Sequence, residues 1–142
     1  MSARLDDRGS ASVITIGILV VVLGVVLTVA AATQLQLQRA RLMHAADEAA
    51  LAAADALDLG AYYGEHVGRL SPDRLEREAR TQLAASSTRQ GLNGARLVRA
   101  SSPDGVIVEV TVTLSAPVLF GVPWLPGRVD LTAEASARST SS

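Results

Sequence analysis

The chain has 142 residues, a formal net charge of −1 and no cysteine, so disulfides and thiolate metal sites are excluded and one small domain beside an anchor is the natural limit. All 13 basic residues are arginine, and no basic segment is interleaved with aromatic residues, so nucleic-acid binding has no support. Apolar residues make up 49% of the chain but aromatic residues only 3%, so a globular core must be built from Val, Leu and Ala.

The first predicted element is a membrane-spanning helix. No residue between Gly9 and Gln38 is charged, and the apolar centre of this stretch runs from 13 to 32. Twenty helical residues at 1.5 Å each span about 30 Å, which is the thickness of the hydrocarbon layer. We therefore expect an N-terminal tail at 1–12, a transmembrane helix at 13–32, and membrane lipid as a partner. The alternative is a cleaved signal peptide with its site at 30–32, but the apolar run exceeds the usual length of such peptides.

One face of the predicted span carries small residues, at Gly17, Gly24, Thr28 and Ala31. Small residues let a second helix approach closely, so this face is a candidate surface for self-association or for a partner helix. The alternative is the ordinary abundance of Gly and Ala in membrane helices. Two arginines flank each end of the span, so charge alone leaves its orientation open.

The helical pattern continues beyond the span, over 33–59. Strong helix formers fill this segment, and neither Gly nor Pro interrupts it before Gly60. We expect one helix from Ser10 to Leu59, ended by Gly60. A narrow apolar stripe follows the helical period and indicates packing against a sheet or a neighbouring helix. Its members are Leu35, Leu42, Ala46, Ala49, Ala53 and Leu57.

Residues 60–137 are predicted to form a small extracytoplasmic α+β domain. Ser71, Pro72 and Asp73 have the residue types that open a helix, and Gly91 ends it. Leu75, Ala79 and Leu83 form the inner face of that helix.

Three strands follow, at 95–100, 106–116 and 129–137. Apolar and polar residues alternate along them, with Val106 to Leu114 supplying the clearest apolar face, so each strand buries one side only. We expect an antiparallel sheet covered on one side by the two helices, followed by a disordered tail at 138–142.

The segment 117–127 between the last two strands holds Phe120 and Trp124, which are the only Phe and Trp of the chain. One interpretation is a loop that folds its apolar side chains under the sheet. The other is an exposed apolar tip that contacts a partner or the bilayer surface.

A search for catalytic chemistry finds none. His44 and Glu48 are an i,i+4 pair that could bind a metal, but no third ligand stands at a recognisable spacing, and a solvated helix face explains them as well. There is no nucleophile elbow, no phosphate-binding loop and no dinucleotide fingerprint. We expect no catalytic, cofactor or metal site, and no cofactor.

The order of features resembles the TadE/TadG-like pilus-assembly proteins of Flp-type (Tad) secretion systems, in their short actinobacterial form. The resemblance rests on the start RGSASV at 8–13, on the apolar run, and on AADEAALAAADAL at 45–57. It is looser at NGARLV, 93–98, followed by a Val-rich strand. It implies a pilin-like fold with a cytoplasmic N-terminus and an extracytoplasmic domain.

The resemblance also implies a candidate prepilin-peptidase site at the Gly9–Ser10 bond. Pilin-type substrates commonly carry Glu five residues into the mature chain, and Ile14 stands there instead. We therefore expect a non-catalytic, membrane-anchored component of a Tad/Flp-type pilus or secretion apparatus, acting as a minor pseudopilin or assembly factor with other membrane proteins of that system. The alternative is a membrane-tethered extracytoplasmic binding module unrelated to pili.

Overall fold

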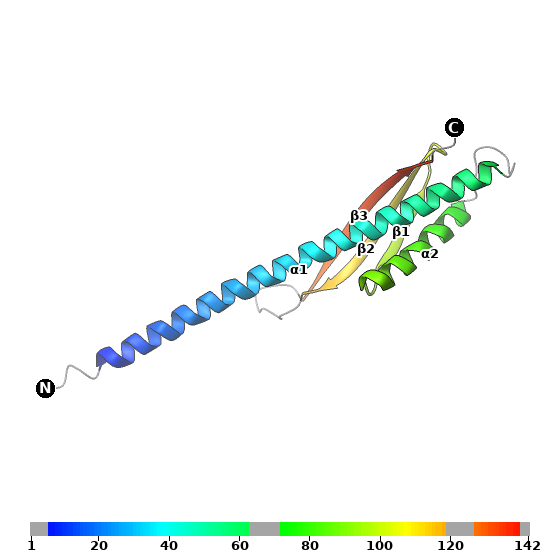
Figure 1. Ribbon diagram of the computed structural model, residues 1–142. Helices are drawn as coiled ribbons and strands as arrows, with labels where there is room; N and C mark the ends of the chain where they lie inside the picture. The colour runs from blue at the N-terminus through cyan, green and yellow to red at the C-terminus, as the bar shows by residue number, and fades with distance from the viewer. Residues whose placement is uncertain (1–5, 63–71, 119–126, 140–142) are drawn as a thin grey trace.

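The computed structural model describes residues 6–62, 72–118 and 127–139. Figure 1 shows one long helix whose first half projects alone, while its second half lies with a shorter helix against a small sheet. The predicted α+β class, with its long apolar helix, second helix and three antiparallel strands, is confirmed. The elements are α1 (Asp6–Tyr62), α2 (Pro72–Gln90), β1 (Arg96–Ser101), β2 (Ile107–Pro117) and β3 (Arg128–Arg138).

Helix α1 is continuous over 57 residues, which corresponds to a rod of about 85 Å. It begins at Asp6, so the expectation that it starts at Ser10 is wrong by four residues, and seven of the twelve residues of the predicted tail at 1–12 are helical. It also runs through Gly60 to Tyr62, so Gly60 does not end it. A single glycine inside a helix costs only about 1 kcal/mol relative to alanine, which a long preformed helix tolerates.

Helix α2 begins at Pro72 and ends at Gln90, as the sequence predicts. Gly91 follows with φ 68°, a conformation that only glycine adopts without strain. The Leu92 amide then donates to the Ser87 carbonyl at 2.9 Å, and the Leu92 side chain is buried. This is the Schellman arrangement, in which a positive-φ residue turns the chain and an apolar residue beyond it packs back on the helix.

The sheet has the order β1-β2-β3, with both pairs antiparallel. Strands β2 and β3 pair along their whole length, from Pro117 opposite Arg128 to Ile107 opposite Arg138. Arg138 is therefore a strand residue, and the predicted disordered tail at 138–142 begins too early. The register of β1 against β2 shifts around Val98, which is an irregularity that alternation alone does not reveal.

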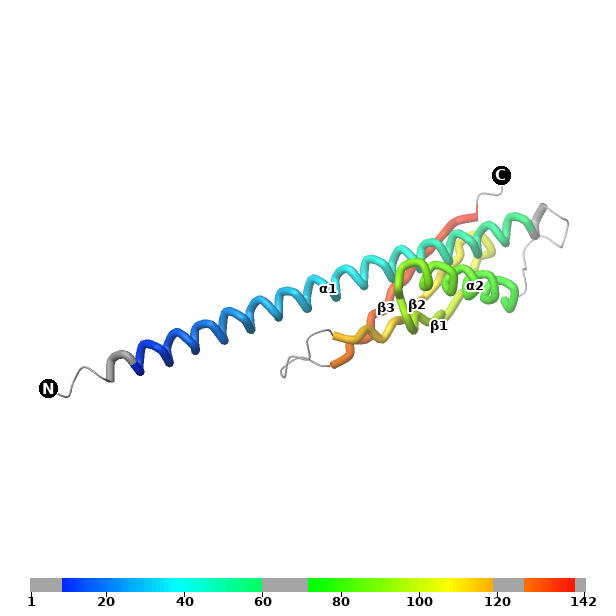
Figure 2. Tube along the Cα trace, turned by 60° about the horizontal axis from the view of Figure 1, so that its bottom comes forward, coloured from blue at the N-terminus to red at the C-terminus, as the bar shows by residue number. Residues whose placement is uncertain are grey.

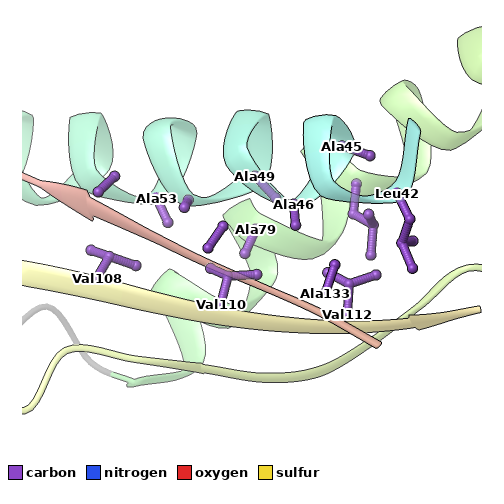
Figure 3. Close-up of a cluster of buried hydrophobic side chains, with 14 of the residues drawn as sticks. Leu42, Ala45, Ala46, Ala49, Ala53, Ala79, Val108, Val110, Val112 and Ala133 are labelled. Atoms are coloured by element: carbon purple, nitrogen blue, oxygen red, sulfur yellow. The ribbon is translucent and has the colours of Figure 1, made fainter. Parts of the chain in front are cut away.

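Both helices cover the same face of the sheet, and no other segment among the described residues covers the opposite face (Figure 2). The inner side chains alternate along the strands as predicted, except that Val106 precedes β2 and is 41% exposed. Figure 3 shows valines of β2 facing alanines of α1 across the core. The buried strand residues are Val108, Val110, Val112, Leu114, Ala116, Ala133, Ala135 and Ala137.

The buried face of α1 is wider than the predicted stripe. Leu42, Ala46, Ala49 and Ala53 are fully buried as expected, whereas Leu35 and Leu57 are only partly buried. Ala45, Ala50 and Ala54 are buried as well. At 100° per residue these seven positions cover about half of the helix circumference. The reason is that α1 contacts α2 in addition to β2 and β3, so two neighbours cover it instead of one.

Candidate membrane span and helix-packing face

The apolar half of α1 is not covered by the rest of the described chain. Twelve large apolar side chains in this half are each more than half exposed. The core helix of a water-soluble protein would be covered, and so large an exposed apolar surface is stable only in lipid. The chain is therefore a single-pass membrane protein. The twelve are Val13, Ile14, Ile16, Ile18, Leu19, Val20, Val21, Val22, Leu23, Val25, Val26 and Val29.

The threonine hydroxyl groups of this half are satisfied within the helix. Thr15, Thr28 and Thr33 each donate to the carbonyl oxygen four residues earlier, at 2.8, 2.8 and 2.9 Å. A threonine bonded in this way leaves no unpaired donor in the hydrocarbon layer.

The segment that resembles a signal-peptide cleavage site lies inside the unbroken helix. Residues 30–32 are helical, and Ala31 is only 2% exposed although its neighbours Ala30 and Ala32 are exposed. A peptidase would have to unwind this turn before it could reach the bond. The structure therefore favours a retained anchor over a cleaved signal peptide.

The four small residues proposed as a packing face differ in their surroundings. Gly17 and Thr28 are exposed, Gly24 is half-buried, and Ala31 is buried within the chain itself. A Cβ at Gly17 would meet no atom within 4 Å. A shallow apolar groove lies over Gly24 and Thr28, and its walls are Val20, Val21, Val25 and Val29. The open part of the face is therefore Gly17, Gly24 and Thr28, which we call the small-residue face.

The small-residue face is aligned with the core face of the same helix. Gly24 and Leu42 are 18 residues apart, which is five turns of 3.6 residues, so both point in the same direction from the axis. The side of α1 that packs on the sheet thus continues downward as the small-residue face, with Ala31 between them. A second helix in the membrane that packed on this face would lie directly below the sheet.

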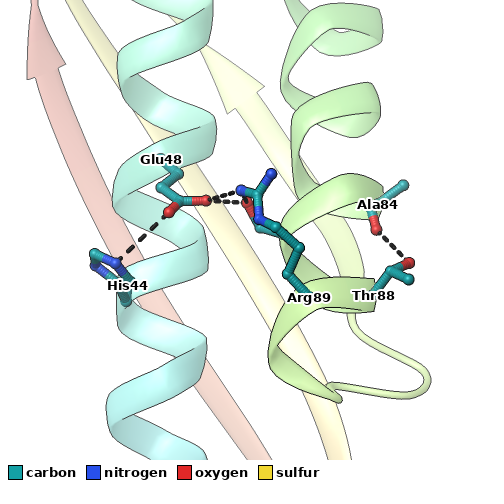
Figure 4. Close-up of polar contacts among 6 residues, drawn as sticks. His44, Glu48, Ala84, Thr88 and Arg89 are labelled. Carbon is teal, nitrogen blue, oxygen red and sulfur yellow. Dashed lines mark hydrogen bonds and ion pairs between the residues drawn. The ribbon is translucent and has the colours of Figure 1, made fainter.

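A polar cluster joins α1 to α2 beside the core (Figure 4). The Ser86 hydroxyl donates to the Glu48 carboxylate, and Arg89 donates to the same carboxylate at 2.8 Å. Arg89 also donates to the Ser86 oxygen at 3.1 Å. On the other side of Glu48, His44 Nε2 lies 3.6 Å from Oε1. We call Glu48, Ser86 and Arg89 the interhelical clasp.

The clasp lowers the pKa of Glu48 below its ordinary value of 4.5. The Ser86 hydrogen bond is the largest cause, and the positive charge of Arg89 adds to it, whereas partial burial acts in the opposite direction. Glu48 thus has an interhelical role that its sequence neighbourhood did not reveal. The available signal was Ser86, which continues the helical spacing of Leu75, Ala79 and Leu83 on the buried face of α2.

The His44–Glu48 pair gains no third metal ligand from any residue whose placement is described. Within those residues no group of three His, Cys, Asp or Glu side chains could hold a metal ion. Glu48 is instead shared among His44, Ser86 and Arg89.

Phe120 and Trp124 lie outside the described residues, so the two interpretations of their loop both stay predictions. The base of that loop is described: the Val118 amide donates to the Gly127 carbonyl at 3.1 Å, and Val118 is 9% exposed.

Comparison with protein families gives one match. Residues 9–56 match the family described as Putative Flp pilus-assembly TadE/G-like. The resemblance to TadE/TadG-like proteins is confirmed over these residues. No curated protein and no solved structure matches the chain.

The TadE/G-like segment coincides with a structural unit. It begins at Gly9, contains the whole apolar run, and ends at Ala56, just beyond the last buried alanine of α1. It therefore holds both the membrane span and the helix face that completes the core. Helix α2 and the sheet lie outside it.

Proposed function

We propose that the protein is a non-catalytic, membrane-anchored component of a Flp/Tad-type pilus or secretion apparatus, acting as a minor pseudopilin or assembly factor. The observation that carries the proposal is the position of the family match: it falls on α1, the helix of the described residues that holds the candidate span and also supplies seven of the nineteen buried residues of the domain core. In this proposal the helix itself carries out the assembly role, through its contacts with partners, and needs no catalytic site.

The rigid connection between span and domain supports this role. Because α1 is unbroken from Asp6 to Tyr62, a partner that tilts or rotates the span must also reorient the sheet. In the proposed arrangement another membrane protein of the apparatus, or a second copy of this chain, packs on the small-residue face. The N-terminus lies in the cytoplasm and the domain on the opposite side of the membrane.

Processing at the Gly9–Ser10 bond is part of the proposal. The bond lies inside α1, three residues after its start, and both residues are exposed. A prepilin peptidase would need to unwind only the first turn, where helix ends fray most readily. Ile14 is 60% exposed toward lipid and has no charge to offer a neighbouring subunit, which argues against a major filament subunit.

N-terminal sequencing of protein isolated from its native membrane tests the processing step. A mature chain beginning at Ser10, and its loss in Gly9→Leu, supports a processed pseudopilin. An intact N-terminus in cells with a working prepilin peptidase rejects processing and leaves an unprocessed anchor that acts in assembly.

Deletion of the gene in a strain that assembles Flp pili tests the wider role. We expect surface pili to be lost or strongly reduced and to return with the wild-type gene. Crosslinking in the same strain should join the span to another membrane protein of the apparatus. Normal pili in the deletion strain would contradict the proposal.

A second candidate is a membrane-tethered binding module unrelated to pili. It is favoured by the uncovered face of the sheet, where polar side chains line a shallow depression. The lining side chains include Arg99, Ser101, Glu109, Thr111, Glu134 and Ser136. Substituting Glu109 and Glu134 with Gln discriminates between the candidates. The assembly role through the span predicts unchanged pili in this variant.

A further inference from the structure

The membrane-proximal end of the domain carries a group of exposed arginines. They are Arg39 and Arg41 on α1, Arg96 at the start of β1 and Arg128 at the start of β3. Three separate elements bring them together, so no single stretch of sequence displays the group. We call these four residues the base arginines.

The height of the sheet above the membrane follows from its packing on α1. Figure 3 places Leu42 near the level of Val112 along the helix axis, and both belong to the buried core. Pro117 is five residues further along β2, which is about 17 Å closer to the membrane and equals the rise of about eleven helical residues. Counting back from Leu42 reaches residue 31. The 2% exposure of Ala31 agrees with this estimate, because another part of the chain must extend to the level of Ala31 in order to bury it.

The domain therefore stands on the bilayer and is not held away from it. Arg128 pairs with Pro117 and lies at the level where the apolar run ends, at Ala32. The backbone positions of Arg39 and Arg41 lie about 10 and 13 Å above that of Ala32 along the helix, at 1.5 Å per residue. Arg96 pairs with Thr113, next to Val112, and so stands near the height of Arg41.

Negative charge is sparse at this end. Asp130, opposite Ser115 in the sheet, is the one carboxylate at this height among the described residues. The others lie further from the membrane, on α1 from Asp47 onward, near the start of α2, in the turn before β2, or in the distal half of the sheet. No hydrogen bond or ion pair joins the base arginines to another residue within the described ranges.

We propose that the base arginines bind the phosphate groups of anionic phospholipids in the leaflet on the domain's side and hold the sheet against the bilayer surface. The headgroup layer is roughly 5–8 Å thick on each side of the hydrocarbon core, so Arg128 starts inside it and the other three lie within reach of its surface potential. Guanidinium groups recognise phosphate oxygens with paired hydrogen bonds. The proposal depends on the span alone and is independent of any role in pili.

The test uses the full chain in vesicles of phosphatidylcholine, with or without phosphatidylglycerol. Because the chain has no cysteine, Ser115→Cys on the exposed sheet face can carry a single environment-sensitive fluorophore close to Arg128. Ser136→Cys places the same fluorophore on the same face at the distal end. Acrylamide is the quencher, since a neutral molecule does not respond to the surface potential.

We expect phosphatidylglycerol to reduce quenching at position 115 and not at position 136, and high salt to reverse the change. Arg39→Gln with Arg128→Gln should lower the ratio of docked to undocked domain by about fivefold per arginine. Arg99→Gln with Arg138→Gln removes the same charge at a greater height, where the surface potential is weaker, and should have a much smaller effect.

The result that overturns the proposal is equal quenching at position 115 in both kinds of vesicle. Equal loss in the proximal and distal double variants would also overturn it, since net charge and not position would then be responsible. Arg39→Lys with Arg128→Lys separates charge from folding: it keeps both charges, so it should retain most of the effect, and a complete loss would contradict the proposed contact.

Discussion

The tightest part of the core is the contact between the alanines of α1 and the valines of β2, and it leads to a sharp prediction for Ala49→Leu. Ala49 is fully buried in the core that α1 forms with α2 and β2, near Ala79 and Val110 (Figure 3). Leucine adds three carbon atoms where the neighbouring residues Ala46, Ala50 and Ala53 are also at 0% exposure, so no adjacent space can accept them. The helix must move away from the sheet or the side chain must adopt a strained rotamer.

Overpacking of this kind costs about 1–3 kcal/mol in the free energy of unfolding. We expect the upper part of that range because α1 packs on both the sheet and α2, and cannot move away from one without disturbing its contact with the other. In a domain of about 100 residues each kcal/mol lowers the melting temperature by about 4–8 °C. The expected fall is therefore about 10–20 °C, and amide exchange in β2 should accelerate by roughly 30-fold or more.

The assay is hydrogen exchange of the β2 peptide in detergent-solubilised full-length protein, together with thermal unfolding. The matched control is Ala40→Leu, which makes the same chemical change at an exposed position of the same helix. Exchange in Ala49→Leu that stays within a factor of two or so of the control would refute the reasoning, because the alanine contact would then have room for three more carbon atoms.

Three further predictions concern the core, the interhelical clasp and the span. Leu42→Ala should cost about 2–5 kcal/mol in unfolding measurements because it leaves a cavity, whereas Leu51→Ala, at a 57% exposed position, should cost well under 1 kcal/mol; equal costs would contradict the core assignment. Glu48 has a lowered pKa in the folded state, so its stabilising effect is complete above pH 4.5 and is lost as the pH falls through the lowered value; Glu48→Gln should be less stable by about 1 kcal/mol at pH 7, and the two proteins should converge in acid. Parallel pH profiles would mean that the clasp contributes nothing. Replacing Gly24 or Thr28 with Leu should weaken helix association in a membrane two-hybrid assay by on the order of tenfold, with insertion unchanged. Unaffected association would mean that neither residue forms a packing face and that both reflect the ordinary composition of membrane helices.

Features that depend on near neighbours in the chain were predictable. The membrane span follows from the uncharged apolar run alone, since lipid leaves a single segment no alternative to a helix. Gly91 ends α2 because only glycine turns the chain there without strain. The one-sided burial of β2 follows from strict alternation, because successive side chains of a strand point to opposite faces.

Features that depend on residues far apart in the sequence required the tertiary structure. The stripe on α1 predicted burial by one neighbour, but α1 contacts both the sheet and α2, and Ala45, Ala50 and Ala54 are buried too. Glu48 and Ser86 are 38 residues apart, and no local rule brings a charge on one helix to a hydroxyl on another. Helix ends were misplaced for a similar reason: a glycine penalty of about 1 kcal/mol ends a marginal helix, but not one already held by its neighbours.

The position of the domain relative to the membrane shows most clearly which features the sequence determined and which the tertiary structure decided. The sequence alone determined that a span ends near Ala32 and that a sheet domain follows, and it suggested a helical extension between them. Only the packing of β2 on α1 decided that this extension is the core of the domain and that Arg128 lies at the end of the span. The physical reason is that height above the membrane depends on which helix turn faces which strand residue, and that register is set by side-chain packing between segments some 70 residues apart.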